Sequence, residues 1–165
     1  MNAILQPSRT SNGQGRLLPL IVALSGNSGC GKTSLVRAAG ARLHDVGDIS
    51  AVVATPAAAQ AKERLSSFIG KLHFVSDDAL DNASLQQIVR TTGEPLLLVE
   101  TVEPLKLPTE ARESHRRVIV FSTAAGNDKV FEYPDAVAAA DLVVLTKNDL
   151  LAHVPFDVAT FTAAR

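Results

Sequence analysis

The chain has 165 residues and a formal net charge of −1, and 46% of its residues are hydrophobic while 20% are charged. A chain of this length forms about one domain, and this composition excludes a wholly disordered protein. The near-zero charge argues against nucleic acid as the main partner, and no apolar run reaches the roughly 18 residues that a membrane-spanning helix requires. The single cysteine, Cys30, makes no intrachain disulfide and favours a reducing, cytoplasmic location.

Short apolar runs alternate with longer mixed segments along most of the chain. We predict that residues 1–16 form a flexible leader and that residues 17–165 form one domain. Alternation of this kind is typical of βαβ units, and strands with apolar residues at consecutive positions are typical of a parallel sheet covered on both faces. The predicted strands are 18–25, 49–55, 71–75, 96–100, 117–122 and 141–146, and the predicted helices are 33–44, 57–69, 84–90, 135–140 and a segment beginning at 157. The expected fold is α/β, with three layers and a mostly parallel sheet.

A phosphate-binding pattern follows the first predicted strand directly and opens the first helix. The sequence GNSGCGKT matches the P-loop pattern GxxxxGK[ST] in full. In such a loop, glycines let backbone N–H groups surround a β-phosphate, Lys32 supplies charge between the β- and γ-phosphates, and Thr33 binds Mg²⁺. Ser34 is expected near the α-phosphate. The nucleotide-binding residues predicted here are Gly26, Asn27, Ser28, Gly29, Cys30, Gly31, Lys32, Thr33 and Ser34. The alternatives are a glycine-rich turn with a capping threonine and, for Cys30, a reactive thiol.

Two later strand ends carry groups that would complete a nucleotide site. The apolar run 96–99 ends in Glu100, which predicts a carboxylate on the Mg²⁺ side of the phosphate loop. The run 142–145 ends in TKND, which fits the pattern [NT]KxD of proteins that bind guanine. In that pattern Asp149 accepts hydrogen bonds from guanine N1–H and the exocyclic amine, the stem of Lys147 packs along the base, and Thr146 steadies the loop. The motif favours GTP over ATP.

At these residues the chain resembles the HypB-type hydrogenase nickel-incorporation GTPases. The sequence GNDKVFEYP at 126–134 is similar to GDDKPLKYP in that family, and ADLVVLTKNDLL at 140–151 is similar to ADLVVLNKIDLL. The resemblance extends from about residue 17 to residue 161. It implies a P-loop GTPase that uses GTP and Mg²⁺, works as a nucleotide-dependent homodimer, and delivers Ni²⁺ to a hydrogenase precursor or accessory protein.

The chain also departs from the family at positions that carry chemistry. Glu103 stands where the family has the glycine that senses the γ-phosphate, and Thr55 stands where it has an aspartate that assists Mg²⁺ and the attacking water. Asp78, Ala79 and Leu107 replace Cys and His metal ligands, so no nickel or zinc site is predicted. The family's amino-terminal cysteine motif and its last strand and helix have no counterpart in the printed sequence. Slow hydrolysis is therefore expected, and no catalytic base is identified.

Two other functions stay open on the sequence. One is a non-catalytic adaptor that keeps affinity for GTP or GDP, and the other, less well supported, is a small-molecule kinase in which the guanine motif is accidental. The four histidines show no i, i+4 pairing and are expected at the surface or at edges, with a nickel site shared across a dimer as the alternative; they are His44, His73, His115 and His153.

Overall fold

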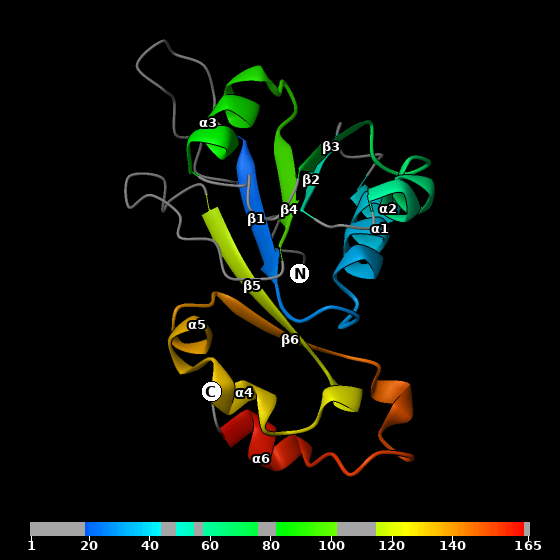
Figure 1. Ribbon diagram of the computed structural model, residues 1–165, viewed down its shortest axis with the longest axis vertical. Helices are drawn as coiled ribbons and strands as arrows, with labels where there is room; N and C mark the ends of the chain where they lie inside the picture. Colours follow the sequence, from blue (N-terminus) through cyan, green and yellow to red (C-terminus); the bar gives the residue numbers. More distant parts are fainter. Residues whose placement is uncertain (1–18, 44–48, 55–57, 76–81, 102–114, 164–165) are drawn as a thin grey trace, which may run out of the picture.

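Six parallel strands form one sheet in the computed structural model, which describes residues 19–43, 49–54, 58–75, 82–101 and 115–163. The predicted leader at 1–16 lies outside these residues. The strand order is β3-β2-β4-β1-β5-β6 and each neighbouring pair is parallel (Figure 1). The strands are β1 (Leu20–Ser25), β2 (Ile49–Ala54), β3 (Lys71–Val75), β4 (Leu96–Glu100), β5 (His115–Ser122) and β6 (Leu142–Thr146). The predicted α/β fold with a parallel sheet is confirmed.

Helices and short 3₁₀ turns connect the strands. They are α1 (Lys32–Leu43), α2 (Ala58–Leu65), α3 (Asn82–Thr91), α4 (Lys129–Glu132), α5 (Pro134–Ala138) and α6 (Val158–Ala163), with 3₁₀ turns η3 (Thr123–Ala125) and η4 (Asn148–Leu150). Helix α2 ends at Leu65 and not at the predicted residue 69, since residues 66–68 form a turn in which the N–H of Phe68 donates to the carbonyl oxygen of Leu65, three residues back. Helix α4 was not predicted, since four residues are too few for a helical apolar period.

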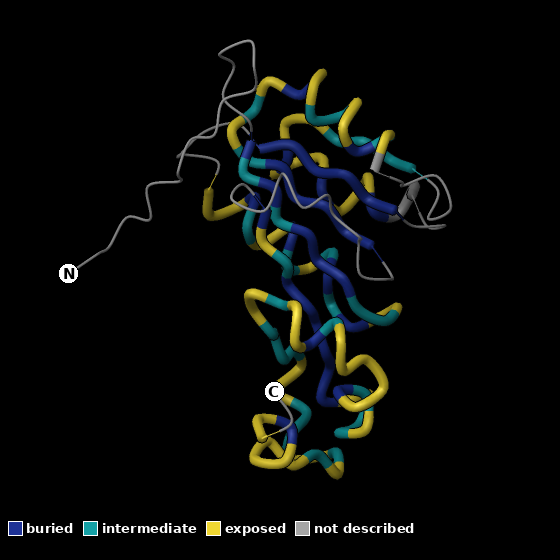
Figure 2. Tube along the Cα trace, turned by 90° about the vertical axis from the view of Figure 1, so that its left-hand side faces the viewer, coloured by how far each residue is buried: buried dark blue, intermediate teal, exposed yellow. Residues whose placement is uncertain are grey.

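The strands are apolar at consecutive positions because helices cover both faces of the sheet. All six residues of β2 are buried, as are four of the five residues of β4. Buried positions follow the strands, whereas exposed positions gather on the helices and connecting turns (Figure 2). Burial on both faces is the arrangement expected of a parallel sheet, and it makes strands β1 and β4 a rigid support for whatever follows them.

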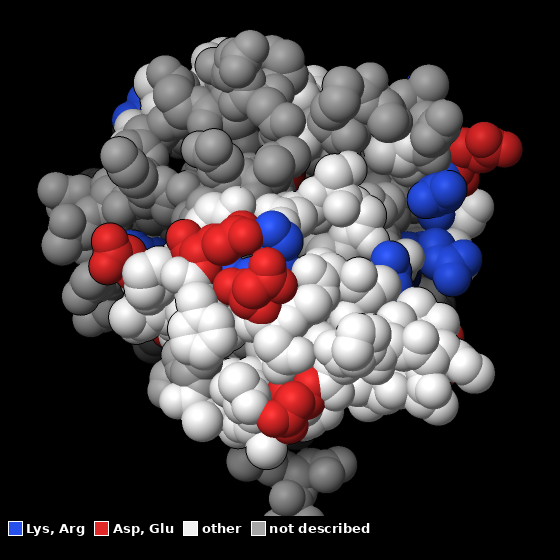
Figure 3. Space-filling view, turned by 60° about the horizontal axis from the view of Figure 1, so that its bottom comes forward, with Lys and Arg blue, Asp and Glu red and all other residues white. Residues whose placement is uncertain are grey.

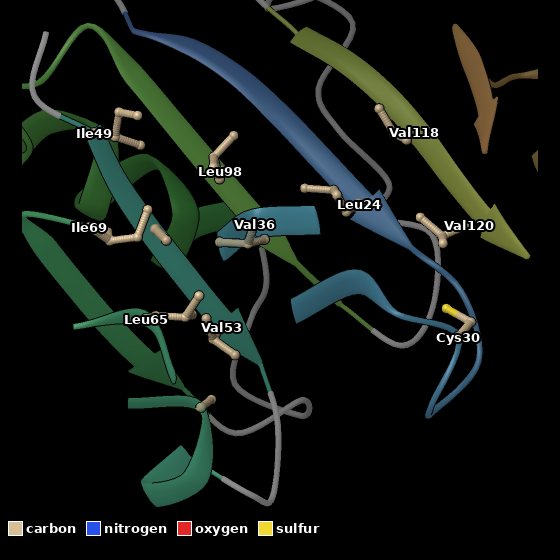
Figure 4. Packing of buried hydrophobic residues seen from close by; sticks show 12 residues of the cluster. Leu24, Cys30, Val36, Ile49, Val53, Leu65, Ile69, Leu98, Val118 and Val120 are labelled. Atoms are coloured by element: carbon tan, nitrogen blue, oxygen red, sulfur yellow. The ribbon is translucent and has the colours of Figure 1, made fainter. Parts of the chain in front are cut away.

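The core has one apolar cluster on one face of the sheet and two on the other. Leu24, Val118 and Val120 belong to the cluster on the face covered by α1 and α2, to which these helices contribute Val36 and Leu65 (Figure 4). The opposite face carries a cluster with α3 and a second cluster in which Ile119, Phe121, Val130, Val137 and Phe161 join β5 to α4, α5 and α6. Ile21, of the cluster with α3, is paired with His115 in the sheet, so the two side chains point to the same face. Side chains two residues apart on a strand share a face, so Ile119 and Phe121 also point there.

The histidine prediction is wrong for His115. Its side chain is buried at the start of β5, which lies between β1 and β6 and is not an edge strand. His73 is half-buried on the edge strand β3 and His153 is exposed, while His44 lies outside the described residues. No helix in the described ranges is long and apolar enough to cross a bilayer.

Candidate functional site

The candidate site lies at the carboxyl edge of the sheet, where three strand ends carry polar residues. Because the strands are parallel, their carboxyl ends share one edge, which is where open α/β sheets bind ligands. Strand β1 leads there into the loop 26–31, β4 ends at Glu100, and β6 ends at Thr146. Strand β1 pairs with both β4 and β5, and β5 pairs with β6, so these three strand ends lie within a run of four adjacent strands, β4-β1-β5-β6.

The loop after β1 has a backbone that requires glycine. Gly26 has φ of +144°, and a Cβ atom built there would lie 2.3 Å from the carbonyl oxygen of Val120. Gly31 has φ of +101°, in the range that favours glycine. The loop therefore passes directly over the end of β5 and enters α1 at Lys32, as the sequence pattern predicts for a loop whose N–H groups turn inward.

Lys32 is 5% exposed, and its ammonium group lies inside the loop. Its Nζ donates to the carbonyl oxygens of Gly26 at 2.6 Å and Asn27 at 3.0 Å, and lies 3.8 Å from Sγ of Cys30. In the part of the chain that the structure describes, no carboxylate forms an ion pair with Lys32. Among the described residues, the hydrogen-bond partners of this charge are neutral groups, which makes the loop a favourable place for an anion.

Thr33 and Glu100 meet across the gap between α1 and β4. The hydroxyl of Thr33 donates to Oε1 of Glu100 at 2.7 Å, although the two residues are 67 positions apart. Glu100 is buried and pairs with Leu24 in the sheet. A hydroxyl and a carboxylate are hard oxygen ligands of the kind that Mg²⁺ prefers, so this donor pair fits the ion beside a phosphate loop.

The remaining loop residues differ in burial. Ser28, Gly29 and Ser34 are exposed, so their backbone or hydroxyl groups face solvent. Cys30 is buried and packs beside Val120 in the apolar cluster under α1 (Figure 4). Its thiol therefore fills space in the core, which argues against the reactive thiol that the sequence left open.

The loop after β6 is joined to the loop after β1. Thr146 Oγ1 donates to the carbonyl oxygen of Cys30 at 2.6 Å and lies 3.1 Å from that of Phe121. Lys147 follows in the left-handed conformation, with φ of 57° and ψ of 36°. Asp149 lies in the 3₁₀ turn η4, and the side chains of Lys147 and Asp149 are exposed. Both side chains are thus accessible to a ligand held at this edge.

Sequence reasoning assigned no role to three groups near this edge. Thr123 donates from its hydroxyl to the carbonyl oxygen of Lys147 at 2.6 Å. The phenol of Tyr133, in the GNDKVFEYP stretch, lies 3.4 Å from Oδ1 of Asn27. Asn127, in the same stretch, exchanges two hydrogen bonds with the backbone of Asp157. For Thr123 the available signal was position, since 123 follows a predicted strand and therefore lies at the same sheet edge as both motifs; for Asn127 and Tyr133 it was the resemblance of 126–134 to the family.

The positions that depart from the family pattern, Thr55, Asp78, Ala79, Glu103 and Leu107, lie outside the described residues. Within the described residues, no three His, Cys, Asp or Glu side chains lie close enough together to hold a metal ion. The described charged side chains on the face shown in Figure 3 occur in small groups separated by uncharged surface.

A glycine-rich loop with a buried lysine, placed between the first strand of a parallel sheet and its helix, defines the P-loop NTPase fold. No family model matches the chain. HypB from Azotobacter vinelandii, a hydrogenase maturation factor, is 45% identical over 65 residues, which are 38% of this chain and 21% of that protein. Part of this chain is thus homologous to HypB hydrogenase maturation factors, and the matched segment spans about a fifth of the length of such relatives.

Solved structures agree over more of the chain. The structure of HypB from Archaeoglobus fulgidus has a TM-score of 0.75 and 28% identity, and the match covers 88% of this chain and 74% of that chain. A structure of FlhF complexed with GMPPNP and Mg²⁺ has a TM-score of 0.62 and 16% identity, covering 88% of this chain and 61% of that chain; this likeness concerns the fold alone. The resemblance to HypB-type proteins predicted from the sequence is confirmed.

Proposed function

We propose that this chain is a GTP-binding protein of the HypB type, which binds Mg²⁺ and GTP and hydrolyses GTP slowly. The observation that carries the proposal is the hydrogen bond from Thr146 to the carbonyl of Cys30. It joins the TKND motif to the GNSGCGKT motif across 116 positions of sequence. A single nucleotide could then contact one motif with its base and the other with its phosphates.

Phosphate binding is assigned to Lys32 and to the N–H groups of the loop. The ammonium group of Lys32 donates to the carbonyl oxygens of Gly26 and Asn27. Charged phosphate oxygens accept stronger hydrogen bonds than neutral carbonyls do. Lys32 would therefore exchange these partners for β- and γ-phosphate oxygens, with the N-terminus of α1 adding its positive dipole.

Thr33 and Glu100 are the residues that would hold Mg²⁺, directly or through water. When bound, the ion neutralises charge on the β- and γ-phosphates. The hydroxyl of Thr33 now donates to Glu100, and both oxygens would turn toward the metal. Glu100 is fixed by its place in the sheet, so the ligand position depends on a rigid element.

Guanine selection is assigned to Asp149, with Lys147 along the base. An aspartate accepts hydrogen bonds from the N1–H and the exocyclic amine of guanine, and adenine lacks this pair of donors on the same edge. The aliphatic stem of Lys147 would cover the apolar face of the base. Both side chains are exposed at the sheet edge and need no rearrangement of the core to reach a ligand.

Hydrolysis would proceed by direct attack of water on the γ-phosphate, with positioning and charge neutralisation as the main contributions. Glu103 would bring a negative charge toward the triphosphate, and like charges 4 Å apart repel by about 1 kcal/mol in bulk water and by more at lower dielectric. Thr55 lacks the carboxylate that the family uses beside Mg²⁺. These two substitutions are the reason for expecting slow turnover, or, in the adaptor alternative, none.

The homology to hydrogenase maturation factors supports a role in maturation, with a hydrogenase precursor or accessory protein as partner and a nucleotide-dependent homodimer as the working form. Nickel storage by this domain is not part of the proposal, because Asp78, Ala79 and Leu107 replace the soft ligands of the family. The chain would act through its nucleotide state.

Titration of the purified chain with GTP and ATP, with and without Mg²⁺, tests the nucleotide assignment. We expect tighter binding of GTP than of ATP, and loss of this preference in Asp149→Ala. The matched control is Asp135→Ala, which removes another exposed aspartate. Equal affinity for the two nucleotides in the unchanged chain would overturn the proposal.

Phosphate release separates a slow GTPase from an adaptor. We expect measurable release from GTP, increased in the double variant Thr55→Asp with Glu103→Gly, because this variant supplies the missing carboxylate and removes the like charge. GTP binding without any release, in the chain and in this variant, would instead support the adaptor.

A further inference from the structure

The carbonyl oxygen of Lys147 accepts two hydrogen bonds, one from a residue later in the sequence and one from a residue earlier in it. One comes from the N–H of Leu150 at 2.9 Å and closes the 3₁₀ turn that carries Asp149. The other comes from the hydroxyl of Thr123 at 2.6 Å, from the turn that follows β5. The turn that carries Asp149 is therefore joined to the turn after β5 by the hydrogen bond from Thr123 to the carbonyl oxygen of Lys147.

The backbone of Lys147 needs this kind of support. Among the described residues it is the one non-glycine position with positive φ, at 57°. A lysine in the left-handed region is unfavourable because its Cβ crowds the following carbonyl oxygen, and such residues persist where their surroundings hold them. The hydroxyl of Thr123 supplies such support from outside the turn, in addition to the bond from the N–H of Leu150.

Thr123 is well placed to be that donor. Its side chain is 1% exposed, and Ser122 and Thr146 are paired in the sheet, so the next residues leave their strands side by side. Its own turn is held as well, because Ser122 Oγ accepts the N–H of Ala124 at 3.2 Å. A buried hydroxyl with a fixed backbone directs its hydrogen bond to a single place.

We infer that Thr123 is a positioning residue for guanine specificity: it fixes the carbonyl of Lys147, and through it the turn that carries Asp149. This inference rests on the proposed function, in which Asp149 reads the base. Thr123 touches neither base nor phosphate in this assignment, and acts through the backbone of Lys147 alone.

The test compares affinities for GDP and ADP in the full chain carrying Thr123→Val, which keeps the side-chain volume and removes the donor. We expect GDP to bind roughly tenfold more weakly, since one buried hydrogen bond is lost, and ADP affinity to change less than twofold. Thr123→Ser restores the hydroxyl and should restore GDP affinity to within twofold. An equal loss of affinity for both nucleotides indicates a structural role only and overturns the inference. Unchanged affinity for both nucleotides overturns it as well.

Two further variants keep the result interpretable. Thr91→Val is the matched control, because Thr91 also donates to backbone carbonyls but lies at the opposite edge of the sheet, at the end of α3. Thr123→Ala is a second variant without the donor, used if the valine variant does not fold. Absence of any GDP preference in the unchanged chain defeats the proposed function, whereas a GDP preference that keeps its full size in both donor-free variants defeats this inference alone.

Discussion

The hydroxyl of Thr146 donates to the carbonyl oxygen of Cys30 at 2.6 Å, which joins the loop after β6 to the loop after β1. Its methyl group also lies beside Gly31, 3.5 Å from the position of a Cβ atom built there. The geometry of the two loops is therefore coupled through one side chain. A ligand that orders one loop is expected to order the other.

Replacing Thr146 by valine should weaken GTP binding about tenfold, because the buried carbonyl of Cys30 loses its donor and the two loops are no longer joined. Fluorescence titration with a labelled guanine nucleotide measures the change. The control is Thr162→Val on α6, where the hydroxyl also donates to a backbone carbonyl, at 2.7 Å, on an exposed surface. Similar affinities for both variants would contradict the coupling.

Glu100→Gln should reduce the gain in GTP affinity that Mg²⁺ produces, because a neutral amide is a weaker ligand for a hard cation than a carboxylate. Affinity measured in the presence of a chelator should change less than twofold. Titration of Mg²⁺ at fixed GTP gives the apparent metal affinity for each protein. If the Mg²⁺ dependence of the variant equals that of the unchanged chain, Glu100 has no role in holding the metal.

Two glycines of the phosphate loop should respond differently to alanine. At Gly26 the new Cβ would meet the carbonyl oxygen of Val120 at 2.3 Å, and this clash adds to an unfavourable φ. At Gly29 φ is +75° but no atom of the surrounding protein lies within 4 Å of the new Cβ. Urea denaturation should show a loss of about 3 kcal/mol for Gly26→Ala and about 1 kcal/mol for Gly29→Ala. Equal losses would mean that the loop does not pack on β5 as described.

Asp157 should make stability depend on pH in the acid range. The hydroxyl of Thr160 and the N–H of Ala159 hydrogen-bond its carboxylate and hold the pKa of Asp157 below the ordinary value of 3.8. A lowered pKa stabilises the fold above the unfolded value, and this contribution is lost as pH falls through the folded pKa, below 3.8.

The measurement compares thermal midpoints of the unchanged chain and Asp157→Ala. Asp157 precedes α6 and its carboxylate accepts the N–H of Ala159 in the first turn, so it caps this helix. Its removal should lower the midpoint at pH 7, because α6 carries Phe161, which packs edge-on against Phe121. The difference between the two proteins should shrink as pH falls below 3.8. Asp128→Ala is the control, since Asp128 precedes α4 without a side-chain capping bond. A difference that stays constant with pH would contradict the role of the carboxylate.

Much of the fold follows from local sequence, because apolar runs of strand length and the positions of glycine and proline are local signals. The strands at 71–75 and 96–100 have the bounds predicted from the sequence, and the helix predicted at 135–140 is found as α5 at Pro134–Ala138. The same reasoning missed α4 and misjudged His115. The burial of His115 depends on β5 lying between two other strands, which no local pattern reveals.

The sequence by itself determined the chemistry available at the candidate site: a loop that glycine allows to turn, a lysine and a threonine at its end, a carboxylate at one strand end and TKND at another. Only the tertiary structure decided which of these groups meet. The strand order brings Thr33 to Glu100 and Thr146 to Cys30, and it brings Thr123 to Lys147, a contact that no motif contains. The physical reason is that strand order results from apolar burial summed over both faces of the sheet, whereas each motif expresses only the preferences of its own few residues.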